Sequence, residues 1–156
     1  MKRIVLYATM AVIAGLFFAN VYNSIVDVPN WQRDMPVSVQ ETRAYMATSN
    51  PGVFFRTFSP MAQILALAGL ILFWKRGNAF RYAWGACVLL SVLGDVFTFG
   101  YFYPRNDIIF INEMSGQTEA IRAAVNEWAA MNWFRSLLVL SAFVAGSIGL
   151  HRTYPA

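Results

Sequence analysis

The sequence predicts an all-α fold, an antiparallel four-helix transmembrane bundle with a short amphipathic helix in its first outer loop. Three observations support this prediction. The 156 residues are 58% hydrophobic and only 13% charged, whereas soluble domains carry about 25% charged residues. Four apolar stretches have the length that a helix needs to cross a membrane, roughly 20 residues. The segments between them alternate in charge, which is typical of a chain that crosses a membrane repeatedly.

The predicted spans cover residues 4–25, 58–74, 82–103 and 128–150, within a single integral membrane domain of residues 1–156. They are too long for barrel strands, and only helices or closed barrels satisfy the backbone in lipid. The first span also resembles a signal peptide, since Lys2 and Arg3 precede it. It is long for such a segment and no clean A-x-A site follows it, so we expect it to be retained.

Two longer segments connect the spans on one side. Residues 38–41, SVQE, form a capping-box pattern, which predicts a short helix from Ser38 to Thr48. The turn sequence NPG at residues 50–52 is expected to end this helix. Residues 104–127 are expected to become helical after Gly116 and to continue into the fourth span. Short connections elsewhere favour an up-down bundle.

Charge is divided unequally between the two sides of the predicted bundle. The side of the termini has six basic residues and no acidic one: Lys2, Arg3, Lys75, Arg76, Arg81 and Arg152. The other side carries the acidic residues Asp27, Asp34, Glu41, Asp107, Glu113, Glu119 and Glu127. The positive-inside rule therefore predicts cytoplasmic termini, in a pattern that suits a bacterial inner membrane. The net charge of +4 reflects this topology, and we expect no nucleic-acid partner.

The sequence gives no sign of a resident metal or cofactor. The one cysteine, Cys87, lies in an apolar run and has no partner for an internal disulfide. The one histidine, His151, belongs to no cluster with metal-ligand spacing. No glycine-rich phosphate loop is present. We therefore expect no metal and no cofactor.

Polar residues recur in the half of each span that lies nearest the acidic segments. On a helix, Trp128, Asn132 and Arg135 share one face, because they are spaced i, i+4 and i+7. In an antiparallel bundle the polar residues of all four spans reach one level and can line one pocket. They are Asn20, Asn23, Asp27, Arg56, Gln63, Asp95, Thr98, Tyr103, Asn106, Asn132 and Arg135.

A purely structural role is the alternative for each of these residues. Asn, Gln, Ser and Thr often serve only as hydrogen-bonding groups between membrane helices, and Arg56 can extend to the headgroups. Asp95 and Arg135 are harder to explain in this way, because ionisable groups in lipid are costly and usually face the bundle interior. Asp95 should be paired with a cation or protonated, and a direct contact with Arg135 is one option.

Other residues of the spans have simpler expected roles. Trp84 and Trp133 are expected to face lipid. Gly69, Gly85 and Gly94 are expected to allow close packing of helices.

Four segments are similar, in the same order, to segments of one family. AGLFFA at residues 14–19 resembles its a-G-l-f-f-a first helix, and NPGVFF at residues 50–55 resembles the N-P segment before its second helix. YPRNDII at residues 103–109 resembles the P-x-N-x-x-L segment after its third helix, although Ile108-Ile109 stands where the family often has a polar residue and Leu. W-x-x-x-N-x-x-R at residues 128–135 resembles the entrance to its fourth helix. The chain is thus similar, over nearly its whole length, to the anthrone oxygenase-like proteins.

The resemblance implies a small four-helix membrane protein. Some members are similar to enzymes that oxidise an anthrone to an anthraquinone without metal or flavin. In such chemistry a base removes a proton next to the carbonyl, and the anion reacts directly with dioxygen. Asp95 or Asp107 is then the expected base. The expected donors to the enolate oxygen are Arg135, Asn132 and Asn106.

The expected ligand is a small hydrophobic molecule, an anthrone-like or other aromatic ketone that enters from the lipid bilayer. Its flat rings are expected to stack on aromatic side chains. The candidate substrate-binding residues are Trp128, Phe99, Phe102, Asn20, Asn23, Arg56, Gln63 and Asp107. Two alternatives remain open: a binding or carrier protein for a lipid- or quinone-like ligand, and a structural membrane subunit without catalysis. A homo-oligomer is compatible with each.

Overall fold

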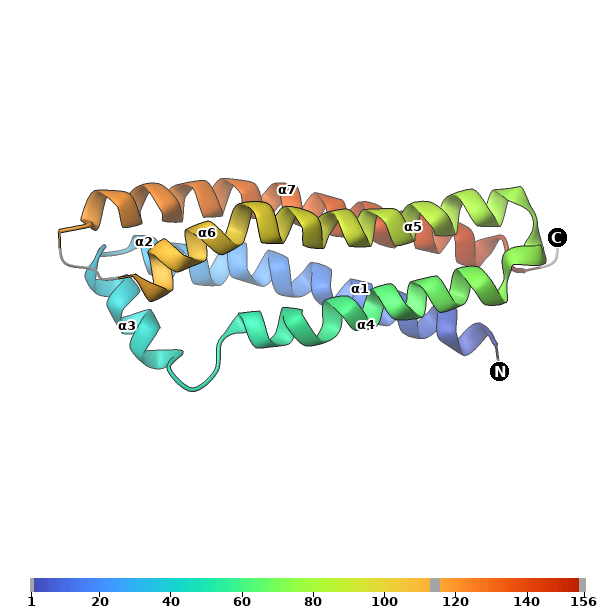
Figure 1. Ribbon diagram of the computed structural model, residues 1–156, viewed down its shortest axis with the longest axis horizontal. Coiled ribbons are helices and arrows are strands. Elements are labelled where there is room, and N and C mark those ends of the chain that lie inside the picture. The colour runs from blue at the N-terminus through green and yellow to red at the C-terminus, as the bar shows by residue number, and fades with distance from the viewer. Residues whose placement is uncertain (1, 113–115, 155–156) are drawn as a thin grey trace.

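The apolar segments form four helical rods that lie side by side along the computed structural model, which describes residues 2–112 and 116–154 (Figure 1). The first rod consists of α1 (Arg3–Tyr22), the π-helical turn η1 (Asn23–Asp27) and α2 (Val28–Gln32). The second is α4 (Pro51–Leu72). The third contains α5 (Asn78–Phe97), the π-helical turn η3 (Thr98–Phe102), α6 (Tyr103–Asn106) and the π-helical turn η4 (Asp107–Ile111), and the fourth is α7 (Thr118–His151). In the described part of the chain these four rods are long and apolar enough to cross a membrane, which confirms the all-α bundle.

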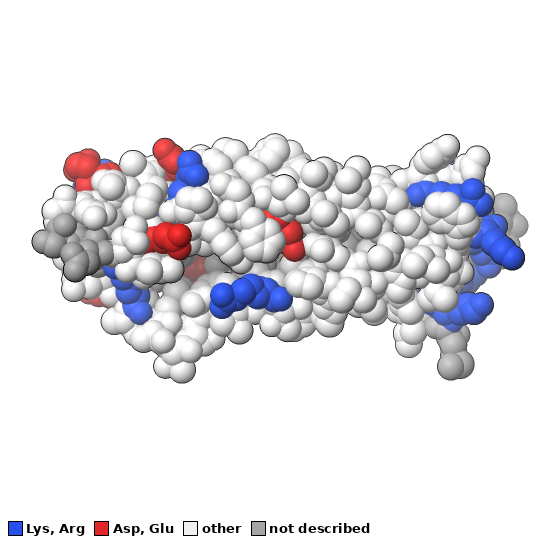
Figure 2. Space-filling view, in the orientation of Figure 1, with Lys and Arg blue, Asp and Glu red and all other residues white. Residues whose placement is uncertain are grey.

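The two ends of the bundle differ in structure and in charge. One end, here the terminal end, holds both termini and the 3₁₀ turn η2 (Trp74–Arg76) between α4 and α5 (Figure 1). The other, here the cap end, holds α2, α6 and the short α3 (Val37–Tyr45). Figure 2 shows only basic charged side chains at the terminal end, whereas the acidic side chains lie in the cap half together with other basic ones. The charge pattern of the sequence therefore matches the ends of the bundle.

The second span begins seven residues earlier than predicted, at Pro51 instead of residue 58. The Asn50 side chain caps α4, because its oxygen accepts a hydrogen bond from the Gly52 amide at 2.9 Å, and Pro51 occupies the first turn. The prediction that this segment only ends a helix was therefore incomplete, because it begins the next one.

The first and third spans also run on, to Gln32 and Ile111 instead of residues 25 and 103. In each, a π-helical turn ends two residues before a proline, Pro29 or Pro104. A proline ring clashes with the carbonyl four residues earlier in a regular α-helix. The wider turn moves that carbonyl aside, so both rods continue past a residue that normally breaks a helix.

The predicted short helix exists as α3, but its start was assigned for the wrong reason. The helix begins at Val37, and Ser38 does not cap it; instead, the Ser38 hydroxyl donates to the Trp31 carbonyl at 2.6 Å. Arg43 holds α3 against the third rod by donating to the carbonyls of Ile108, Ile109 and Asn112 at 3.1, 2.7 and 2.8 Å. Partial burial lowers the pKa of Arg43, but an arginine stays charged in proteins, so these are charge-assisted bonds.

Trp84 fills the core near the terminal end, which contradicts the prediction that it faces lipid. It is fully buried, and its indole N–H donates to the Ala66 carbonyl at 2.7 Å. The backbone beside Gly69 and Gly149 makes room for it, since a Cβ at either glycine would come within 3.0 Å of the indole. Trp84 is buried because three helices approach closely around one large side chain.

Of the other predictions about lipid-facing and packing residues, some were confirmed and some were wrong. Trp133 is 52% exposed, as expected of a side chain that faces lipid. Gly69 does allow close packing, but a Cβ at Gly85 or Gly94 would meet nothing within 4 Å. The packing role predicted for those two glycines was therefore wrong.

Trp84→Ala should lower the free energy of unfolding by about 3–5 kcal/mol, the usual cost of removing a fully buried large aromatic side chain. Thermal unfolding in detergent, followed by circular dichroism, measures the change. Trp133→Ala is the matched control and should unfold within a few degrees of the wild type. Equal destabilisation by the two substitutions would contradict the assigned core.

Candidate functional site

A cavity lies between the four rods, about midway along the bundle. Its volume is about 50 Å³, within a wider space of about 510 Å³ that includes the open surroundings. All four rods contribute to its walls, so the packing of the whole bundle defines its shape. The lining residues are Ile13, Leu16 and Asn20 of α1, Phe55, Ser59 and Ala62 of α4, Ser91, Gly94 and Asp95 of α5, Thr98 of η3, and Arg135, Val139 and Ala142 of α7.

The cap end of the cavity holds its most deeply buried polar side chains. Asn20 and Arg135 line its cap side, while Ile13 and Ala142 lie seven residues along the same helices, on the terminal side. Seven helical residues span about 10 Å. The cavity therefore extends along the bundle for roughly that distance and carries polar groups at both depths, because Ser59, Ser91 and Asp95 also line it.

The Arg135 guanidinium lies at the polar end, only 7% exposed, without an acidic partner. Its Nη2 donates to Asn132 Oδ1 at 2.5 Å, but its Nε has no hydrogen-bond partner among the described residues. No ion pair in the described ranges includes it. A buried charge without a counter-charge is costly, so this arrangement is typical of a group that awaits an anionic or strongly polar ligand atom.

Aromatic rings surround Arg135 in place of a carboxylate. Its guanidinium carbon lies 4.1 Å from the ring centroid of Phe102, 5.3 Å from that of Phe55 and 5.4 Å from that of Trp128. The faces of aromatic rings attract cations. These contacts hold the guanidinium in position while leaving its charge available for a ligand.

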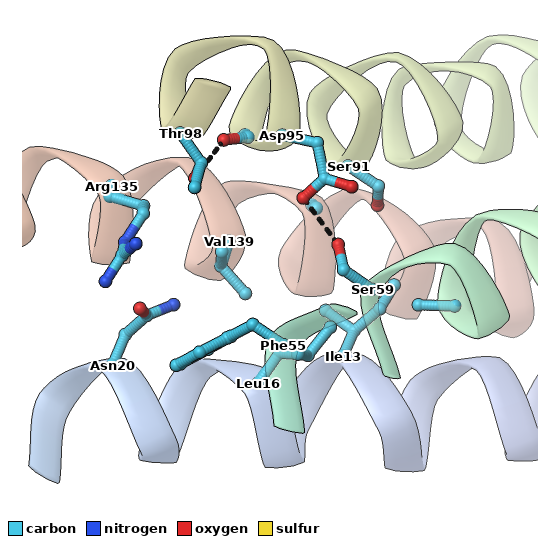
Figure 3. Close-up of a pocket in the computed structure, with 13 residues that line it drawn as sticks. Ile13, Leu16, Asn20, Phe55, Ser59, Ser91, Asp95, Thr98, Arg135 and Val139 are labelled. Atoms are coloured by element: carbon cyan, nitrogen blue, oxygen red, sulfur yellow. Dashed lines mark hydrogen bonds between the residues drawn. The ribbon is translucent and has the colours of Figure 1, made fainter. Parts of the chain in front are cut away.

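Asn132 fixes the orientation of Arg135. The Asn132 amide nitrogen donates to the Asn20 carbonyl at 2.8 Å and to Ser24 Oγ at 2.7 Å, which turns its oxygen toward the guanidinium. The Asn20 side-chain oxygen is itself buried and has no partner in the described part of the chain. Figure 3 shows the Asn20 amide and the Arg135 guanidinium facing one another at one end of the cavity. Two polar atoms without hydrogen-bond partners, Asn20 Oδ1 and Arg135 Nε, thus lie at this end of the cavity.

The Asp95 carboxylate lies farther along the cavity, held by the opposite wall. It accepts a hydrogen bond from Ser59 Oγ at 2.6 Å (Figure 3) and another from Gln63 Nε2, also of α4, at 2.6 Å. Asp95 and Arg135 form no ion pair among the described residues. The direct contact that was one option at the sequence level therefore does not occur, and the Asp95 carboxylate favours the charged Arg135 guanidinium only through space.

The partly exposed lining residues of the cavity lie mainly on α4 and the third rod, with Val139 of α7, so the cavity comes nearest the surface between α4 and α5. Its lining residues from α1 are all buried, whereas Phe55 and Ser59 of α4 and Ser91, Asp95 and Thr98 on the third rod are partly exposed. Because these helices are apolar spans, a mouth at their seam faces the lipid at mid-bundle depth.

The remaining predicted residues lie outside the cavity lining, in three settings. Asn106 accepts a hydrogen bond from the Trp128 indole at 3.0 Å, within the cap. Asn23 is buried and donates to Asp27 of its own π-helical turn. Three others point outward: Phe99, Arg56 and Asp107 are exposed. Of the predicted residues, the cavity lining contains Asn20, Asp95 and Arg135. Asn132, Phe102 and Trp128 contact Arg135 from outside the lining, and Gln63 lies behind Asp95. The structure leaves Asn106, Asn23, Phe99, Arg56 and Asp107 apart from the cavity.

Sequence reasoning missed Ser59 and Gly94. Ser59 lies four residues before Gln63, so the two share a helix face, and this spacing was a usable signal. Gly94 matters because it has no side chain, and the residues around it in the sequence look like those around an ordinary packing glycine. No pattern in the sequence distinguishes a glycine that borders a cavity from one that packs against a neighbouring helix.

Fold and cavity together define a small helical membrane protein with an internal, partly polar cavity that comes nearest the surface between two of its helices. The family model for anthrone oxygenase matches residues 52–145, which is more than half of the chain and includes Ser59, Asp95 and Arg135. The protein therefore belongs to the anthrone oxygenase family. No curated protein and no solved structure matches the chain.

Arg135→Met should leave the melting temperature unchanged or raise it, because it removes a buried charge that forms no ion pair among the described residues, and an apolar side chain of similar length fills the space. Thermal unfolding in detergent measures the effect. The matched control is Arg43→Met, which removes an arginine with three carbonyl acceptors and should lower the melting temperature. A large loss of stability in Arg135→Met would mean that Arg135 serves the fold.

Proposed function

We propose that the protein is a cofactor-independent oxygenase that acts on an anthrone-like or other small hydrophobic aromatic ketone. The observation that carries this proposal is the separation of Asp95 and Arg135 on two walls of one cavity. A base and a cationic donor that do not touch leave room for a substrate between them. Membership of the anthrone oxygenase family supports the same reaction class.

In the proposed reaction the ketone oxygen lies at Arg135, and the acidic carbon lies near Asp95. The Asp95 carboxylate takes a proton from that carbon, and the electron pair of the broken C–H bond moves into the ring system as an enolate. The Arg135 guanidinium stabilises the negative charge that develops on the oxygen. The carbanion then reduces dioxygen, forming a C–O bond and a peroxide, which loses water to leave a second carbonyl. One methylene and one dioxygen thus give one ketone and one water.

The neutral polar residues of the site are positioning groups in this proposal. Ser59 and Gln63 hold the Asp95 carboxylate from α4, and Asn132 holds Arg135 from within α7. Pre-oriented groups lower the barrier because no reorganisation is needed when charge develops. Phe102 and Trp128 exclude water beside the guanidinium, which strengthens its interaction with an enolate oxygen.

The bilayer supplies the substrate in this proposal. An apolar ketone concentrates in lipid, and the mouth of the cavity lies between two apolar helices. At the cap end, access is closed by a buried apolar cluster that includes Trp31, Phe102, Ile121 and Trp128. Entry from the lipid at the seam of α4 and α5 is therefore the shorter route.

One observation favours a second candidate function, a carrier for a lipid- or quinone-like ligand. Both oxygens of Asp95 already accept a hydrogen bond, as expected of a carboxylate that shapes a binding site and moves no proton. A carrier needs the same cavity and no base. Asp95→Asn therefore separates the two functions, since a carrier keeps ligand binding and an oxygenase loses turnover.

Purified protein in detergent should consume dioxygen when anthrone is added, with one anthraquinone formed for each dioxygen. Asp95→Asn and Arg135→Met should lower turnover by about 100-fold or more, the usual effect of removing a general base or an oxyanion donor. An oxygen electrode and the absorbance of the quinone measure the two quantities.

Asp107→Asn is the matched control for the base. Asp107 was the other candidate at the sequence level, and it is exposed outside the cavity, so this variant should keep its turnover. Each variant is first checked for helix content. Full activity in folded Asp95→Asn would exclude Asp95 as the base.

We also propose that the protein lies in a bacterial inner membrane with both termini in the cytoplasm. The basic residues of the terminal end support this orientation. A C-terminal fusion to green fluorescent protein should fluoresce in bacteria, and a fusion to alkaline phosphatase should be inactive. The opposite pair of results would reverse the orientation.

A further inference from the structure

Gly94 of α5 differs from the other buried glycines of the bundle. A Cβ at Gly69, Gly146 or Gly149 would lie 3.0 Å or less from a neighbouring side chain, so each of these glycines admits that neighbour. A Cβ at Gly94 would meet nothing within 4 Å, although the residue is buried. Because Gly94 lines the cavity, the space that its missing side chain leaves is part of the cavity itself.

Two small residues extend this space on neighbouring helices. Ala62 of α4 and Ala142 of α7 are buried and line the same apolar part of the cavity. Small residues between helices normally serve close packing. Here both pack in one apolar cluster with Ile13 and Leu16, and they also border the cavity beside Gly94.

The polar end of the cavity supplies independent evidence for a ligand. Arg135 Nε and Asn20 Oδ1 have no partners in the described part of the chain, and both side chains are more than nine-tenths buried, at 7% and 2% exposure. Both line the cavity, and Figure 3 shows them at one end of it. A ligand whose polar group lies there must extend its apolar part along the cavity, past Asp95 and Gly94.

We propose that Gly94 is a specificity-determining residue, whose missing side chain admits the fused aromatic rings of a bulky ligand beside Asp95. The part of the test that measures oxidation rests on the proposed oxygenase function. The part that measures ligand binding does not. Gly94 immediately precedes Asp95, so a side chain added there narrows the cavity at the depth of the carboxylate. Large flat ligands are excluded first and small ones last.

The test compares Gly94→Leu with Gly85→Leu, a matched control on the same helix. A Cβ at Gly85 also meets nothing within 4 Å, but Gly85 does not line the cavity. The substrates are anthrone, with three fused rings, and 2-tetralone, with two. Gly94→Leu should lower kcat/KM for anthrone by about 10-fold or more, in the range expected when a pocket rejects a few carbon atoms. Its kcat/KM for 2-tetralone and both values for Gly85→Leu should change much less.

Stability separates this role from a structural one. Gly94→Ala replaces a helical glycine by a better helix former without meeting a neighbour, so its melting temperature should stay the same or rise. Its kcat/KM for anthrone should nevertheless fall, in the same direction as that of Gly94→Leu. Gly94→Ala also keeps the inference testable if Gly94→Leu fails to fold. A lower melting temperature with unchanged selectivity would mean that Gly94 serves packing.

Binding of anthraquinone, which cannot be oxidised in the same way, separates failure of this inference from failure of the oxygenase function. Wild type and Gly85→Leu should gain thermal stability when anthraquinone is added, and Gly94→Leu should gain less. If anthraquinone binds in this pattern without any dioxygen consumption, the oxygenase function fails and the role of Gly94 stands. If Gly94→Leu matches the wild type in both binding and turnover, the role of Gly94 is overturned. If the wild type binds no anthraquinone, the inference is overturned as well.

Discussion

The polar groups of the cavity are arranged around one buried charge, the guanidinium of Arg135. In a soluble protein such a group lies at the surface, and in lipid it faces the interior. Here the interior supplies an amide oxygen from Asn132 and three aromatic faces, but no carboxylate. Phe102 and Trp128, two of these rings, also belong to the apolar cluster that closes the cap. The same side chains therefore stabilise the cap and hold the charge.

The four helices around this charge are not held equally tightly by their neighbours. α7 and α1 are joined at the site by the hydrogen bonds of Asn132, and α5 packs closely on α7. α4 packs mainly on α1 and α5, and Pro60 lies inside it. Since proline has no amide N–H, the helical hydrogen bond to the Arg56 carbonyl is absent. The wall that carries Ser59 is thus the least constrained, and it borders the mouth. Asp95 lies at this seam, where it bonds Ser59 and Gln63, so a ligand that enters there meets the proposed base first.

The parts of the site that lie on regular helix could be predicted from the sequence. The stripe of Trp128, Asn132 and Arg135 lies within uninterrupted α7, where spacing alone determines the face. The predictions for Phe99, Asn106 and Asp107 assumed the same regularity. These residues lie within or beyond η3, where hydrogen bonds run from residue i to i+5. One extra residue in a turn rotates all later side chains by about 100° relative to a regular α-helix. Side chains beyond η3 therefore do not lie on the helix face that the spacing in α5 predicts. Buried polar stripes are local information, whereas helix irregularities and empty space depend on the packed bundle.

The separation of Asp95 from Arg135 argues against helix association as their main role. Two opposite charges that served only to join α5 and α7 would gain most by direct contact, because attraction between charges is strongest at short distance in a medium of low dielectric constant. Instead, each charge is held by neutral groups: Asp95 by Ser59 and Gln63, and Arg135 by Asn132. The space left between them is continuous with the open volume beside Gly94. A ligand that brings a carbonyl oxygen to Arg135 and an acidic C–H bond to Asp95 supplies the interactions that neither residue obtains from the protein.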